Sequence, residues 1–194
     1  VRLAVQAILG SPRFLFRMER VPSTLRAGQT YRIADLDLAS RLSFFLWGTA
    51  PDETLLNLAE KDQLHLPAVF GKQVARMLAD PRAEALSTRF ASQWLRLQDV
   101  AHVRPDHHFY SYWDTTLSQA MVRETQLFFD SLVREDRSLL EILNADYTFV
   151  NERLAKHYGI PNVLGNQFRR VDLSETNRRG ILGQGSILLL TSIA

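Results

Sequence analysis

Residues 114–134 read DTTLSQAMVRETQLFFDSLVR, the longest helical pattern in the chain. Apolar side chains recur there at the three-to-four-residue spacing of one helix face, at Leu117, Met121, Phe128 and Leu132. Asp114 stands just before them, where its carboxylate can accept a hydrogen bond from a free backbone N–H group at the start of a helix. The pattern therefore predicts a long helix that ends at about Arg134 and buries one face.

Capping residues divide the rest of the chain into shorter helical segments. Further helices are expected to begin at Asp35, between Thr49 and Asp52, at Pro67, after Asp80–Pro81 with its stripe running to Leu97, at Ser138, at Asn151, and at Ser174 with a helix continuing through Leu190. The only extended piece that the pattern suggests is residues 31–33. We predict an all-α fold, an irregular bundle of about eight or nine helices with little or no sheet.

Composition is that of an ordinary globular protein, with 46% hydrophobic and 23% charged residues in a chain of 194. The absence of cysteine excludes disulfides, thiolate metal sites and the covalent attachment of c-type haem within these residues. The formal net charge is only +2, and the basic residues are scattered, so a nucleic-acid-binding role is disfavoured. The longest stretch without charge, residues 180–194, is shorter than the ~20 residues of a membrane span.

Glu124 is the first candidate for chemistry, because it follows Met121 by three residues and precedes Phe128 by four on the same helix face. A carboxylate there is expected to be buried, and a lone buried charge is costly. We predict an ionised Glu124 paired with an arginine, first Arg41 and otherwise Arg123 or Arg137, in a structural role. A functional carboxylate and a simple boundary position are the alternatives, so Glu124 and Arg41 are the weak catalytic candidates and the catalytic residues themselves stay unknown.

A loop is predicted over residues 101–113, where imidazoles and a carboxylate crowd together. Imidazole and carboxylate groups suit zinc and iron. The spacing matches no helical His-x-x-x-His arrangement, so a solvated turn is favoured and no metal is predicted; the weak candidate ligands are His102, Asp106, His107 and His108.

The glycines of residues 178–185 (RRGILGQG) resemble those of a phosphate loop. No strand precedes them and no Lys-Ser/Thr pair follows, so close approach of helices explains them better.

Several runs resemble the domain-of-unknown-function family 1592, and they cover most of the chain. They are residues 37–47 (DLASRLSFFLW), 51–56 (PDETLL), 76–82 (RMLADPR), 90–95 (FASQWL), 124–129 (ETQLFF), 135–138 (EDRS) and 146–160 (DYTFVNERLAKHYGI). Residues 7–9 (AIL) and 11–17 (SPRFLFR) resemble the tail of family 1595, and residues 178–180 (RRG) and 184–186 (QGS) resemble the opening of family 1588. The third resemblance stops where that family continues with Pro and Arg-Thr-Ser-Pro, because this chain reads TSIA at residues 191–194.

The resemblance implies three segments: a preceding helical module's tail over 1–20, a main helical domain over 34–160, and the start of a following module over 170–194. It also implies a planctomycete-type, exported or periplasmic, multidomain protein with a c-type cytochrome domain elsewhere. The family's activity is not established, and both ends of the sequence look like cuts through a longer polypeptide.

Two functions then compete: a scaffold or interaction module beside a c-type cytochrome domain, and a part of a haem-dependent oxidoreductase whose cofactor lies outside these residues. We expect neighbouring domains of the same polypeptide as partners, with no nucleic acid and no membrane span. The oligomeric state stays open, and no cofactor is expected within these residues. A deep polar pocket at Glu124 and the Arg41 helix would favour the enzyme, and a filled core there would favour the scaffold.

Overall fold

The fold is taken from a computed structural model, which describes residues 1–16, 18–19 and 21–192. Helices hold 56% of the residues and strands 4%, so the prediction of an all-α chain with little sheet is confirmed. The described part has ten α-helices, slightly more than the eight or nine expected, because several are single turns. None of these helices is long and apolar enough to cross a bilayer.

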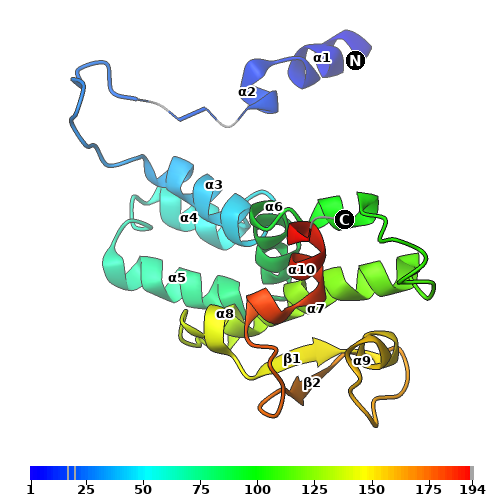
Figure 1. Cartoon of the computed structure of the whole chain (residues 1–194). Helices are drawn as coiled ribbons and strands as arrows, with labels where there is room; N and C mark the ends of the chain where they lie inside the picture. Colours follow the sequence, from blue (N-terminus) through cyan, green and yellow to red (C-terminus); the bar gives the residue numbers. More distant parts are fainter. Residues whose placement is uncertain (17, 20, 193–194) are drawn as a thin grey trace. The chain divides into compact units, whose positions relative to one another are not determined.

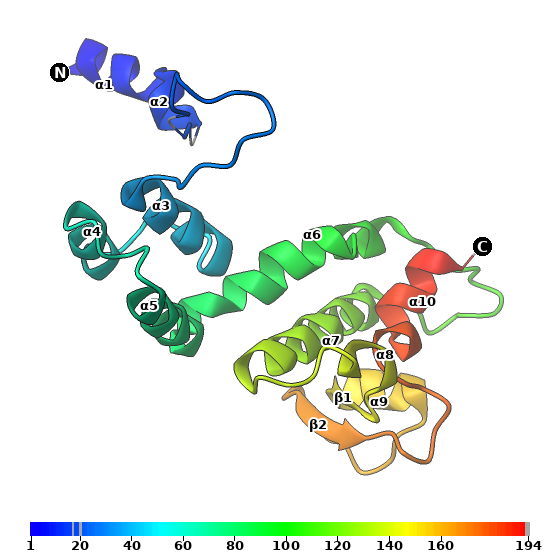
Figure 2. The same ribbon diagram turned by 90° about the vertical axis from the view of Figure 1, so that its left-hand side faces the viewer.

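The chain divides into two compact units, Val1–Asp80 and Pro81–Ala194. In the described residues of the first unit, every regular element is a helix (Figure 1). They are α1 (Arg2–Leu9), α2 (Pro12–Leu15), α3 (Asp35–Leu46), α4 (Glu53–Glu60) and α5 (Pro67–Ala79). α3 packs against both α4 and α5, and the three helices lie side by side in both views (Figure 2).

The helices of this unit begin within a few residues of the predicted positions. Pro67 opens α5 as expected, and Asp52 caps α4 by accepting a hydrogen bond from the Leu55 N–H. Thr49 therefore lies outside that helix. Asp35 is the first residue of α3 rather than its cap, and its buried carboxylate accepts the His65 backbone N–H. Residues 31–33 form no strand.

α7 (Thr115–Arg134) organises the second unit. Its start and end agree with the prediction: Asp114 is the cap and accepts the Leu117 N–H at 2.6 Å. The helix packs against β1 (Tyr147–Val150), α9 (Glu152–Tyr158) and α10 (Gly185–Thr191). All four residues of the predicted stripe are buried, Leu117 and Met121 in one apolar cluster and Phe128 and Leu132 in another.

The second unit also has a small antiparallel sheet that the sequence did not predict. β1 pairs with β2 (Arg169–Asp172), so that Tyr147 lies opposite Asp172 and Val150 opposite Arg169. β1 is only four residues long, which is too short for the alternating pattern of a strand to stand out between helical segments.

Three helix predictions in the second unit are wrong in detail. The single helix expected after Asp80–Pro81 is a series of short pieces: η1 (Pro81–Glu84), η2 (Leu86–Ala91), α6 (Ser92–Trp94) and η3 (Leu97–His102). Ser138 does not cap α8 (Glu141–Asn144), whose cap position is Leu140. Ser174 starts no helix, because the Asp172 carboxylate holds its N–H in a turn, and helical structure resumes only at η4 (Ile181–Gly183).

Candidate functional site

Glu124 lies inside the second unit with only 1% of its surface exposed. Two hydroxyl groups donate hydrogen bonds to its carboxylate: Thr148 Oγ1 to Oε1 and Tyr158 Oη to Oε2, each at 2.6 Å. The Gly185 backbone N–H in turn donates to Tyr158 Oη at 2.7 Å. α7, β1, α9 and α10 thus meet through one hydrogen-bonded chain, and the space around the carboxylate is filled by protein.

Burial makes the charged form of Glu124 unfavourable. It raises the pKa of the Glu124 carboxyl to about 7, although the two hydroxyl donors and the positive charge of Arg178 oppose that rise. Burial of the Tyr158 phenol, and then the neighbouring Glu124 carboxyl, raise the pKa of Tyr158 well above its ordinary value, so the phenol stays protonated and keeps donating. Glu124 is therefore a group that titrates near neutral pH inside a closed core.

The predicted arginine partners of Glu124 are wrong. Arg41 pairs with Glu19, Arg123 with Glu84 at 2.7 Å, and Arg137 with Glu135 and Glu141. The burial of Glu124 was predictable from the helix face on which it lies. Its hydrogen-bond partners, Thr148 and Tyr158, come from distant segments whose positions cannot be predicted from helical periodicity.

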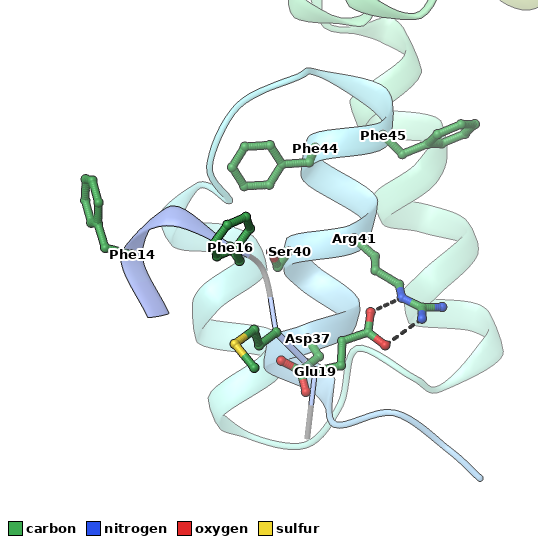
Figure 3. A pocket seen from close by; sticks show the side chains of 9 residues that line it. Phe14, Phe16, Glu19, Asp37, Ser40, Arg41, Phe44 and Phe45 are labelled. Carbon is green, nitrogen blue, oxygen red and sulfur yellow. Dashed lines mark hydrogen bonds and ion pairs between the residues drawn. The ribbon is translucent and has the colours of Figure 1, made fainter. Parts of the chain in front are cut away.

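Arg41 lines a cavity of about 690 Å³ within the first unit, between α3 and the segment that contains α2. Figure 3 shows its guanidinium facing the Glu19 carboxylate. The charges of Arg41 and Glu19 satisfy each other, so the charged group that this cavity still offers among its lining residues is the carboxylate of Asp37.

The residues of the 101–113 loop do not come together as a metal site. The Asp106 carboxylate accepts the His108 backbone N–H at 2.8 Å, which closes a local turn of the kind the sequence favoured. In the part of the chain that the structure describes, the group with metal-ligand geometry is instead Asp35, Asp62 and His65. His102, His107 and His108 take no part in it.

That group is an ion-pair network that ties α3 to the segment before α5. His65 Nδ1 lies 3.1 Å from both oxygens of Asp35, and Arg32 pairs with Asp62 at 3.1 Å. Sequence reasoning missed it because Arg32 and Asp35 lie about thirty residues from Asp62 and His65, and the two segments share no motif.

A second cavity, of about 440 Å³, lies next to the Glu124 chain of hydrogen bonds in the second unit. We call it the Arg178 pocket. Its walls are mostly apolar and aromatic, with few polar side chains. The residues that line it are Val103, Pro105, Asp106, Phe109, Tyr110, Trp113, Met121, His157, Arg178, Gly185, Leu188, Leu189 and Ser192.

Arg178 is held in place on the wall of this pocket. Its guanidinium carbon lies 4.2 Å from the centre of the Tyr158 ring, and Nη1 donates to the Gly183 carbonyl at 2.7 Å. Beside it, His157 Nδ1 is buried without a hydrogen-bond partner among the described residues. Burial and the charges of Arg178 and Arg153 lower the pKa of His157, so its imidazole is neutral at pH 7.

The glycines near Arg178 serve close packing, as the sequence indicated. A Cβ at Gly180 would lie 2.4 Å from the Ile142 carbonyl oxygen, and one at Gly185 would lie 2.8 Å from Tyr158 Oη. Only a residue without a side chain lets these segments approach. Arg178 and Gln184, whose amide nitrogen and oxygen are both buried without a partner among the described residues, carried no signal of their own in the sequence.

Comparisons with known proteins agree with the main resemblance. A family model described as PSD4, protein of unknown function (DUF1592), matches residues 33–160. No curated protein and no solved structure matches the chain. The resemblances of the flanking segments to families 1595 and 1588 stay predictions.

Proposed function

The chain belongs to the PSD4 family of proteins of unknown function (DUF1592), and on that premise we propose that it is a scaffold or interaction module of a larger, exported polypeptide that also carries a c-type cytochrome domain. In this role it holds neighbouring domains of the same polypeptide in position and performs no chemistry of its own.

The exposed apolar face of α1 carries the proposal. Val5, Ile8 and Leu9 lie on one side of this eight-residue helix, and the helix has no buried residue. Isolated helices shorter than about 12 residues are barely stable in water, and most helical stability comes from packing an apolar face. α1 therefore has the properties of a helix that packs on a neighbouring domain.

The surroundings of Glu124 also support a scaffold role, because they argue against catalysis by this carboxylate. A catalytic carboxylate must reach a substrate, whereas Glu124 is sealed in the core and both its oxygens accept hydrogen bonds from the protein. At Glu124 this is the filled core that favours a scaffold, whereas Arg41 lines a cavity of its own in the first unit.

The cytochrome neighbour and the export of the protein are supported by the family resemblance alone. The residues present do not fit c-type haem, because its attachment needs two cysteines and the chain has none. The haem of this proposal therefore belongs to another domain of the polypeptide.

Photo-crosslinking in the full-length protein tests the proposal. A benzophenone side chain placed at Ile8, on the apolar face of α1, should crosslink to the c-type cytochrome domain of the same polypeptide. The same side chain at Gln6, on the other side of α1, is the matched control and should crosslink far less. Equal yields from both positions, or products that exclude the haem-bearing domain, would contradict the proposed role.

A further inference from the structure

We propose that the Arg178 pocket binds a small molecule that carries one carboxylate on an aromatic, apolar body. Its volume of about 440 Å³ lies in the range of ligand sites, which combine apolar walls with a few convergent polar groups. This goes beyond the scaffold role, because it gives the module a ligand of its own.

The anion preference follows from Arg178. No carboxylate among the described residues lies within ion-pair distance of its guanidinium, unlike the guanidinium groups of Arg153 and Arg137. The stack on Tyr158 and the hydrogen bond to Gly183 fix the side chain while using one of its five donors. A prearranged guanidinium with free donors recognises a carboxylate in a bidentate manner.

The apolar part of the ligand follows from the walls. Phe109 and Leu188 line the pocket and yet remain 79% and 46% exposed, and Trp113 and Tyr110 stand beside them. Clustered exposed aromatic and aliphatic side chains mark binding surfaces, and the aromatic rings among the lining residues suit contact with a flat ring system.

The charge of the ligand is limited to one. Arg178 is the only lysine or arginine among the lining residues, and the neutral His157 adds a hydrogen-bonding nitrogen but no charge. The Gly185 N–H already donates a hydrogen bond to Tyr158 Oη, so it is not available to a phosphate group. The carboxylate of Asp106, which also lines the pocket, disfavours a ligand with two negative charges. These features favour a carboxylate over a phosphate.

Calorimetric titration of the full-length protein with 2-naphthoate tests the inference, and 2-naphthamide serves as the neutral ligand of the same shape. We expect 2-naphthoate to bind at least about tenfold more tightly than the amide, because a charge-assisted hydrogen bond to Arg178 is lost in the amide. Arg178→Gln should weaken 2-naphthoate binding by about the same factor and leave the amide unaffected.

Two further variants keep the test decisive. Arg179→Gln is the matched control, since Arg179 contacts Asp146 and Ser174 outside the pocket, and it should leave binding unchanged. Phe109→Ala removes an exposed wall without disturbing the fold and should weaken both ligands. Failure of 2-naphthoate to bind, equal affinity for acid and amide, or unchanged affinity in Phe109→Ala would each overturn the inference.

Discussion

At the scale of single residues, Glu124 links the stability of the protein to pH. Its carboxyl has an ordinary pKa of 4.5 when the chain is unfolded and a pKa of about 7 when it is folded, chiefly because of burial. Between these two values the unfolded chain releases a proton that the folded protein keeps. Folding stability therefore falls as pH rises through this window, by about 3 kcal/mol in total.

Glu124→Gln should remove this fall, because an amide does not ionise. We expect the variant to be less stable than the parent by about 1 kcal/mol at pH 5, where one hydroxyl loses its acceptor, and at least as stable at pH 8. Urea unfolding followed across pH 5 to 8 measures both values.

The control for this prediction is Glu60→Gln on α4, an exposed glutamate whose substitution should leave the pH dependence as it is. If Glu124→Gln showed the same slope as the parent, the carboxyl would be ionised in the folded protein, as the sequence suggested.

At the scale of elements, neighbouring residues in the sequence determine where α7 begins, whereas contacts with distant residues determine the path of the chain after β2. The start of α7 needs only Asp114 and the apolar stripe that follows it. Gly180 is different: its backbone has φ +49, and its N–H donates to the Ala145 carbonyl. A Cβ at this position would collide with the carbonyl groups of Ile142 and Leu143. This close approach brings η4 against α8.

Gly180→Ala should destabilise the protein by about 3 kcal/mol, because the new methyl group meets backbone atoms that cannot move aside and the φ value strains it further. Gly71→Ala is the same chemical change in α5, where the added Cβ meets nothing within 4 Å. It should stabilise the protein by about 0.5–1 kcal/mol. Urea unfolding of the two variants should thus give opposite signs, and a neutral Gly180→Ala would refute the close approach.

At the scale of the whole molecule, burial is uneven along the chain. α7 has nine buried residues over its length, whereas α1 has none. Local opening is cheapest where few apolar contacts hold a segment, so the two helices should differ widely in protection.

Hydrogen exchange of the isolated 194-residue chain should show this difference. The amides of α1 are expected to exchange almost as fast as those of an unfolded peptide, and those in the middle of α7 should be among the slowest. Strong protection of α1 in the isolated chain would mean that it packs on the chain itself, and the proposed docking to a neighbouring domain would then lose its support.

The sequence by itself determined the helical class, the bounds of α7, the cap of α9 at Asn151 and the burial of Glu124, because these depend on residues three or four positions apart. Only the tertiary structure decided that Thr148 and Tyr158 hold that carboxylate and that Arg41 turns to Glu19. It also decided that Arg178 lies on a pocket wall with no carboxylate partner among the described residues. The physical reason is range: a helix repeats every 3.6 residues, so its faces can be read locally, but the partner of a buried polar group is any residue that folding brings within about 3 Å.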